Sequence, residues 1–286
     1  MTSIKNYRKK MRIKKGISSV LLNIFFIMIC FLALIPVFYS LLVSLSGNNS
    51  LVSDSIWPKE WTFENYIKLF TEHDIGTWFG NSLLLVVATV VFSLTIAVPA
   101  AYAFSRMRFH GRNFVLRQLI ILNAFPSVLS MFAIYKLMRS MGLVNTKTGL
   151  IIIYVGTMSI FALWNMKGYF DTIPVAIEEA ARVDGASQNQ IIWKIIMPLA
   201  KPATAVTAVM ILIYVWNEYI YAVTFMTGED NFTLAAGLYS LQASETSGNW
   251  PVFAAASLVV SLPILIIFLL SQKYMVSGLS SGGVKK

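Results

Sequence analysis

Apolar residues are grouped along the chain in six long runs, which shorter polar segments separate. A helix needs about 20 mostly apolar residues to cross the hydrocarbon core of a bilayer, and the runs reach this length. The pattern therefore predicts an all-α integral membrane protein, with transmembrane helices near 17–45, 80–104, 115–138, 148–167, 203–225 and 252–272. Four of these runs contain a proline that is expected to kink the helix: Pro36, Pro99, Pro126 and Pro263.

The N-terminal arm, 1–16, is basic and leads directly into the first apolar run. This order imitates a secretory signal peptide, whose apolar region is short and ends at a small-residue cleavage site. The run at 17–45 is much longer and offers no such site. We therefore expect a retained first transmembrane helix.

Lysine and arginine are distributed unevenly among the polar segments. The arm 1–16 carries seven, the 105–117 and 167–201 loops carry four each, and the tail 273–286 carries three, whereas the other loops together carry five. Cytoplasmic flanks of membrane helices are enriched in these residues. The bias places both termini in the cytoplasm, in agreement with an even number of helices. It also accounts for the net charge of +10 without a nucleic-acid partner.

The composition excludes several kinds of site. Only 13% of the residues are charged, whereas an ordinary soluble domain has about 25%. The single cysteine, Cys30, lies in an apolar run, so neither a disulfide framework nor a metal cluster is possible within the chain. The two histidines, His73 and His110, lie in predicted loops and are not interpreted as metal ligands.

The two long loops on the expected outer side are acidic. The loop 46–79 contains a segment, 62–70, that predicts a short helix at the membrane interface, with a partner-binding surface as the alternative. One face of this helix is apolar and aromatic, and consists of Phe63, Tyr66, Ile67 and Phe70. The loop 226–250 has no lysine or arginine and carries an apolar stretch.

The loop 167–201 is about 35 residues long and contains its own helix signals. Pro174 suits the first position of a helix, and Gly185 suits the left-handed turn that ends one. Ser187 begins an S-x-x-Q capping box, which predicts a second helix that Pro198 would end. Simple connections between helices are shorter, so the loop predicts a helix–turn–helix that docks a cytoplasmic partner.

This loop also carries a family signature. The run Glu179-Ala180-Ala181-x-x-Asp184-Gly185-Ala186, with its later Pro198, resembles the EAA motif of bacterial ABC importer permeases. The chain length, the six-helix plan and the run Trp216–Tyr219 are similar to those of maltose-type (MalG-like) carbohydrate permeases. The resemblance implies a type I ABC importer permease fold whose core spans 80–272. It also implies that the ATPase-coupling residues are Glu178, Glu179, Ala180, Ala181, Asp184, Gly185, Ala186 and Pro198.

The same resemblance implies the partners. An ATPase dimer, a second homologous permease subunit and an extracytoplasmic solute-binding protein would complete a sugar importer in a bacterial plasma membrane. The chain contains no Gly-Lys pair and hence no phosphate-binding loop. We therefore expect no enzymatic activity and no cofactor in this chain, with ATP and Mg held by partner subunits. In the family the loop that matches 226–250 contacts the binding protein, and here this implies Glu229, Asp230, Phe232, Leu238 and Tyr239.

Glu218 is an ionisable residue inside the fifth predicted helix. Such a group is costly within a membrane, so it is a candidate for the substrate pathway. The alternative is that it lies near the outer end and pairs with water or a neighbouring helix. Weaker pathway candidates are Asn123, Asn165, Trp216, Asn217 and Tyr221.

An ion-gradient-driven secondary transporter is the alternative function. The sequence shows one clear ionisable residue within the spans and no repeat of interrupted helices, both of which count against it. A membrane-embedded enzyme is a third class, for which the spans offer no paired carboxylates or metal-ligand cluster.

Overall fold

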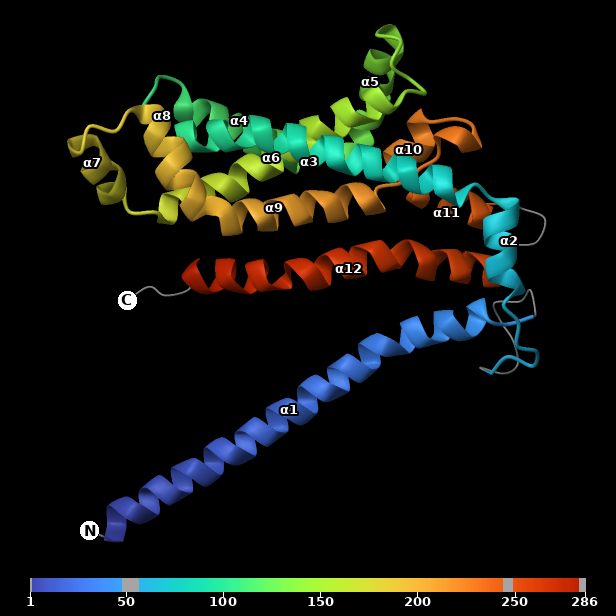
Figure 1. Cartoon of the computed structure of the whole chain (residues 1–286), viewed down its shortest axis with the longest axis horizontal. Coiled ribbons are helices and arrows are strands. Elements are labelled where there is room, and N and C mark those ends of the chain that lie inside the picture. Colours follow the sequence, from blue (N-terminus) through green and yellow to red (C-terminus); the bar gives the residue numbers. More distant parts are fainter. Residues whose placement is uncertain (1, 48–56, 244–248, 283–286) are drawn as a thin grey trace. The chain divides into compact units, whose positions relative to one another are not determined.

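The computed structural model describes residues 2–47, 57–243 and 249–282. Regular structure in these ranges is helical, apart from an isolated β-bridge between Ser46 and Trp61 (Figure 1). Five helices are long and apolar enough to cross a membrane, and a bent pair makes six if it counts as one span. The predicted all-α membrane architecture is thus confirmed for the described part of the chain.

The smaller of two compact units consists of Met1–Leu69 and Glu245–Leu258. Its helix α1, Thr2–Ser44, begins within the basic arm rather than near residue 17, so arm and span form one helix. Apolar side chains from Val20 to Leu41 are exposed along α1. A helix that is apolar all round needs an apolar surrounding, which a bilayer supplies.

Helix α2, Glu64–Glu72, confirms the short helix predicted in the first outer loop. Polar contacts attach it to the end of α1, because the Asn65 side-chain amide donates to the backbone oxygens of Ser44 and Ser46, each at 2.9 Å. The Ser44 and Tyr66 hydroxyl oxygens lie 2.8 Å apart. The apolar face is exposed, as the interfacial interpretation requires, at Phe63, Ile67 and Phe70.

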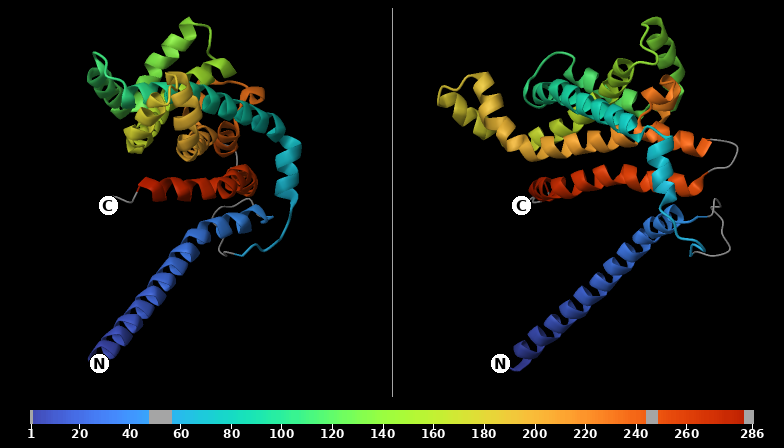
Figure 2. Two further views of the ribbon diagram at one scale, coloured as in Figure 1. Left: turned by 60° about the vertical axis from the view of Figure 1, so that its left-hand side comes forward. Right: turned by 45° about the vertical axis from the view of Figure 1, so that its right-hand side comes forward.

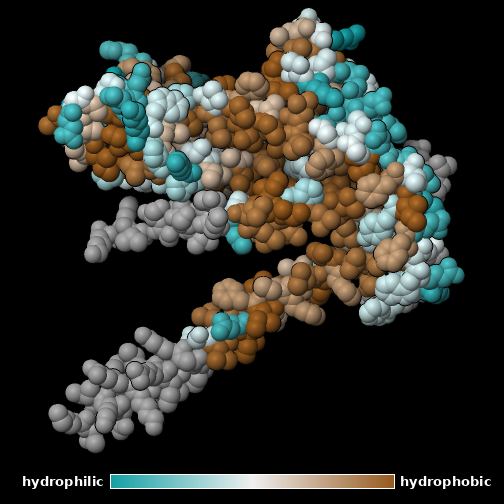
Figure 3. Space-filling view, in the orientation of Figure 1, coloured by the Kyte–Doolittle hydropathy of each residue, from teal (hydrophilic) through white to brown (hydrophobic). Residues whose placement is uncertain are grey.

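The larger unit consists of Phe70–Ser244 and Val259–Lys286. At its centre α3, Ile75–Arg106, packs along α6, Lys147–Thr172, and α9, Met197–Asn217, lies beside both (Figures 1 and 2). The largest fully buried side chains in this bundle include Leu85, Tyr102, Leu150, Tyr154, Met166, Phe170 and Ile211. Hydrophobic side chains cover the middle of the unit, and hydrophilic ones gather around α7 and around the turn η2 (Figure 3).

Helix α3 begins five residues earlier than predicted because Asp74 caps it. The Asp74 carboxylate accepts hydrogen bonds from the hydroxyl group of Thr77 at 2.6 Å and from its backbone N–H at 3.1 Å. These two bonds lower the pKa of Asp74 below its usual value, the hydroxyl bond most.

The third predicted span is two helices, α4, Arg112–Ala124, and α5, Ser127–Ser140. They meet at an angle of 102°, so the expectation of one kinked helix is wrong. Pro126 disfavours helical backbone at the residue before it, and Phe125 is extended, with a ψ of 130°. No residue of α4 is buried, so packing does not hold the two halves in line.

The fifth predicted span is also interrupted. Helix α9 ends at Asn217, and a short helix, α10, follows at Ile220–Phe225. Glu218 has extended backbone, with φ −73° and ψ 119°. It therefore lies at the break between two helices rather than inside one.

Helices α7, Val175–Val183, and α8, Gln188–Gln190, project beyond the ends of α6 and α9 (Figure 2). The prediction that Pro198 ends the second helix is wrong. Ile191–Ile196 form a π-helical turn that continues into α9, and Pro198 lies in the first turn of α9. The wider π turn accommodates a proline that cannot donate to the ordinary helical ladder.

The last part of the larger unit contains the turn η2, Glu229–Asn231, and the helix α11, Leu234–Ala243. Gly237 lies directly against the ring of Trp78, and a Cβ atom at this position would overlap the indole. Helix α12, Trp250–Gly282, continues through most of the segment 273–286, where the glycine- and serine-rich composition predicts flexibility. Residues 283–286 lie outside the described ranges.

Candidate functional site

The turn between α7 and α8 is a Schellman motif, which satisfies the carbonyl groups at the end of a helix. Gly185 has a φ of 83° and donates its N–H to the oxygen of Arg182 at 3.0 Å. The N–H of Ala186 donates to the oxygen of Ala181 at 2.9 Å. The capping box predicted at Ser187 is present with both of its hydrogen bonds. The left-handed glycine and the two-helix arrangement are therefore confirmed.

One face of this segment is exposed. Glu179, Ala180 and Asp184 lie on it, whereas Ala181 is buried and Ala186 is half-buried. Pro174 is the N-cap of α7, whereas the sequence predicts it at the first position inside the helix. Two large apolar side chains are also exposed here, Val183 at 87% and Trp193 at 60%.

Glu178 faces away from this surface, although the family motif groups it with Glu179. Its side chain is 1% exposed. One carboxylate oxygen accepts a hydrogen bond from Nε of Arg106, and the other accepts one from the Tyr102 hydroxyl at 2.8 Å. Glu178 therefore fastens α7 to α3, and Glu179 is the exposed member of the pair.

The contacts of Arg106 and Tyr102 extend to two further elements. Arg106 Nη2 donates to the oxygen of Ile173, directly after α6, at 2.8 Å. The Gln188 side-chain amide of α8 donates to the Tyr102 hydroxyl oxygen at 2.7 Å. We call Tyr102, Arg106, Glu178 and Gln188 the Arg106 cluster. It joins α3, α7 and α8 in one hydrogen-bonded group.

Three residues of this cluster are not predicted from the sequence, in which Arg106 counts only as a loop charge: Tyr102, Arg106 and Gln188. One sequence feature points to Tyr102 and Arg106. Tyr102 and Arg106 are four residues apart and therefore share a helix face. A charged residue at that position, beside a helix with two adjacent glutamates, is a candidate ion-pair partner.

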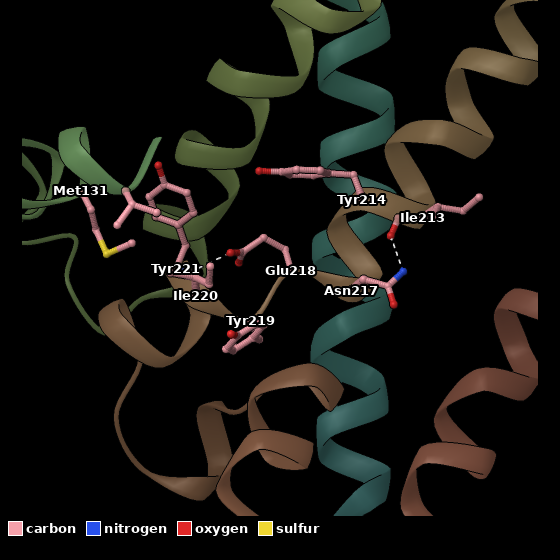
Figure 4. A pocket seen from close by; sticks show the side chains of 9 residues that line it. Met131, Ile213, Tyr214, Asn217, Glu218, Tyr219, Ile220 and Tyr221 are labelled. Atoms are coloured by element: carbon pink, nitrogen blue, oxygen red, sulfur yellow. Dashed lines mark hydrogen bonds between the residues drawn. The ribbon is translucent and has the colours of Figure 1, made fainter. Parts of the chain in front are cut away.

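A second group of predicted residues lines a cavity beside the helix breaks. Its two adjoining parts have volumes of about 420 and 850 Å³ and share Tyr214 and Tyr221. Asn217 and Glu218 line the smaller part (Figure 4), and Asn123 lines the larger one. Four of the predicted pathway residues are thus brought together: Asn123, Asn217, Glu218 and Tyr221.

Glu218 pairs with neighbouring elements and lines the cavity at the same time. One carboxylate oxygen accepts the backbone N–H of Tyr221 at 2.9 Å, which caps α10. The other accepts the hydroxyl of Tyr154, on α6, at 2.6 Å. A carboxylate oxygen has two lone pairs, so each can accept a further hydrogen bond from a ligand. Tyr154 was missed, although an acidic group within a span needs such a partner.

Two other pathway candidates lie apart from the cavity lining. Trp216 is 3% exposed, and its indole N–H donates to the oxygen of Val260, on α12, at 3.1 Å. Asn165 is exposed on α6, with its amide 3.9 Å from the sulfur of Met210. Trp216 therefore packs helices together in the described structure.

The predicted binding-protein contacts lie on the segment 229–239. Glu229 and Asp230 are exposed, and the ring of Phe232 lies 6.1 Å from that of Trp78. Farther along, Leu238 is half-buried in α11, and Tyr239 is 46% exposed and stacked on Tyr219, with 5.4 Å between ring centroids.

Breaking the buried ion pair is expected to destabilise the protein. Arg106→Met removes the closer and better-buried of the two cations beside the Glu178 carboxylate and leaves only the half-exposed Arg182 at 3.9 Å, which costs up to about 3–5 kcal/mol. Arg106→Met with Glu178→Met removes both charges and should recover most of that loss. Thermal unfolding of the detergent-purified protein measures both variants. Lys68→Met is the control, because its pair with Glu64 is exposed and contributes at most about 1 kcal/mol. Equal, small effects of all three variants would contradict the prediction.

Comparison with known proteins places this architecture in a family. The protein-family model described as "binding-protein-dependent transport system inner membrane component" matches residues 93–280. The galactooligosaccharides transport system permease protein GanQ of Bacillus subtilis is 34% identical and covers 91% of this chain and 94% of its own. The maltose/maltodextrin permease protein MalG of Yersinia pestis is 33% identical and covers 93% of both chains.

A solved structure supports the same assignment. A bacterial ABC transporter involved in the import of the acidic polysaccharide alginate matches with a TM-score of 0.74 and 28% identity, over 92% of this chain and 96% of its own. The described helices, the sequence relatives and this structure agree. The chain belongs to the family of binding-protein-dependent transport system inner membrane components.

Proposed function

We propose that this chain forms half of the transmembrane pathway of an ATP-driven importer for an uncharged di- or oligosaccharide. An extracytoplasmic binding protein delivers the sugar, and a second, homologous permease completes the pathway. The observation that carries the proposal is the exposed α7–α8 turn, with Glu179 and Asp184 of the family motif on its surface, on a bundle that also contains a mostly apolar cavity with a few polar side chains in its lining. The names of the relatives, which transport galactooligosaccharides and maltodextrins, support a sugar as cargo.

The exposed face of α7 is the proposed docking site of an ATPase dimer. Glu179 and Asp184 supply charge there, and Val183 supplies apolar area. The distribution of lysine and arginine supports a cytoplasmic location for this face and for both termini. The chain has no phosphate-binding loop, so ATP and Mg²⁺ are assigned to the ATPase subunits. Glu229 and Asp230 then lie on the outer side, within reach of a binding protein.

The cavity beside the helix breaks is the proposed sugar pathway through this subunit. Its lining combines tyrosine rings, two amides and the carboxylate of Glu218, which suit the faces and hydroxyl groups of a sugar. Its lining residues include this one carboxylate and no lysine or arginine. A carboxylate without a cation repels an acidic sugar, which favours an uncharged cargo here.

The secondary transporter is the second candidate, and one observation now favours it. Two interrupted helices, α4–α5 and α9–α10, line the cavity with their breaks. Broken helices around a midplane site are typical of gradient-driven transporters. Membership of a binding-protein-dependent transport family weighs against this function.

Glu179→Lys is expected to weaken ATPase recruitment at least tenfold, because a reversed charge at a docking surface opposes its partner. Co-purification of the ATPase with the membrane-inserted permease measures the effect. Glu229→Lys is the matched control, since it reverses an exposed glutamate at the other end of the unit. If the ATPase co-purifies with the Glu179→Lys permease as well as with the wild type, this face is not the docking site.

Glu218→Gln is expected to lower sugar uptake about tenfold, because it removes a charge-assisted hydrogen bond to a sugar hydroxyl. The amide can still accept from Tyr221 and bond to Tyr154, so the helix break is kept. Uptake of a neutral and of a uronate trisaccharide by the complete importer measures the preference. Glu64→Gln, on α2, is the control. Preferred uptake of the uronate by the wild type would contradict the proposed cargo.

A further inference from the structure

Helix α3 carries an anchor for the 229–234 loop at its N-terminal end. The Asn81 amide donates to the backbone oxygens of Asp230 and Phe232, each at 2.9 Å. The indole N–H of Trp78 donates to the oxygen of Glu229 at 3.1 Å. Both side chains are almost completely buried, Trp78 at 1% exposure and Asn81 at 4%. These bonds fix the backbone of the loop to α3 and leave the Glu229 and Asp230 side chains free to contact a partner.

The anchor is reinforced on both sides. The Ser82 hydroxyl oxygen accepts the N–H of Leu234 at 2.8 Å, which fixes the start of α11. Gly237 of α11 lies against the Trp78 ring, where no side chain would fit. Any displacement of the 229–237 segment therefore acts directly on the first turns of α3.

The other end of the same helix carries the Arg106 cluster. Tyr102 holds both α7 and α8, since its hydroxyl donates to Glu178 and accepts from Gln188. Arg106 holds α7 through a buried ion pair. A buried ion pair adds little net stability compared with apolar packing, but separating its partners leaves a buried charge and is costly. It therefore suits a contact that must keep one orientation.

The two anchors lie on one continuous helix. Asn81 and Tyr102 are 21 residues apart in α3, which corresponds to about 32 Å along the axis at 1.5 Å per residue. A helix packed along its length is one of the elements through which a displacement at one end can reach the other. Pro99 is the weak point of α3, one turn before Tyr102, so any bending is expected beside the Arg106 cluster.

We propose that α3 transmits binding-protein contact to the ATPase-docking segment, with Asn81 and Trp78 as positioning residues at one end and Tyr102 and Arg106 at the other. The inference rests on the proposed function, which supplies a partner at each end. The new part is that α3 connects the two partner-binding ends of the chain. Loading of the 229–234 loop moves the first turns of α3, and the Arg106 cluster carries this movement to α7 and α8 together.

A double-mutant cycle between the two ends tests this. Asn81→Ala releases the loop, and Tyr102→Phe removes one hydroxyl but keeps the ring, which packs edge-to-face on Phe170. The readout is the stimulation of ATP hydrolysis by sugar-loaded binding protein in the complete reconstituted importer. Each single variant is expected to reduce the stimulation about fivefold, the effect of one or two lost hydrogen bonds. Asn81→Ala should leave basal hydrolysis and ATPase co-purification unchanged, because its contacts lie at the end of α3 away from the docking segment, and this separates positioning from misfolding.

The variant that combines Asn81→Ala with Tyr102→Phe shows whether the two residues act through the same helix. If both residues act through α3, the second change adds nothing, and the loss stays about fivefold. Independent sites so far apart would multiply to about 25-fold, and this result, or normal stimulation in the single variants, would overturn the inference. Thr95→Val is the matched control, because its hydroxyl bonds only Val91 of the same helix. Trp78→Phe replaces Asn81→Ala if the latter does not insert. Absence of stimulation in the wild type would instead contradict the proposed function.

Discussion

The buried ion pair between Arg106 and Glu178 is the interaction on which the functional end of this protein depends. Burying a carboxylate to 1% exposure is costly unless a cation and further donors satisfy it, and Arg106 and Tyr102 do so. This requirement fixes the rotation of α7 about its own axis. Because Glu178 points inward, its neighbour Glu179 points outward, and the exposed face that we propose as the docking site is defined by a contact on its opposite side.

Backbone irregularity supplies the second functional feature. Within a bilayer, non-helical backbone is tolerated only where protein or water satisfies its polar groups. The breaks at Pro126 and Glu218 border the two adjoining parts of the cavity, whose mostly apolar lining includes the polar side chains of Asn123, Asn217 and Glu218. The Glu218 carboxylate caps α10 and bonds Tyr154, and thereby maintains the opening that it lines. The proposed sugar pathway and the interruption of the helices therefore depend on the same residues.

Features encoded within a few residues were predictable from the sequence, and features that depend on distant partners were not. The Gly185 turn rests on local hydrogen bonds and was anticipated in detail. Prolines inside apolar runs gave an ambiguous signal: Pro99 stays within α3, which buries many side chains against its neighbours, whereas Pro126 separates two helices because α4 buries none. The Arg106–Glu178 pair joins residues 72 positions apart, and only the fold brings them together.

The most direct test of this account is the energy source of transport. Proteoliposomes that contain this chain, its partner permease and the ATPase should accumulate labelled sugar only when binding protein is present outside and ATP is present on the ATPase side. An imposed ion gradient without ATP should have no effect. Accumulation by this chain alone, driven by an ion gradient, would contradict the account and establish the secondary transporter in its place.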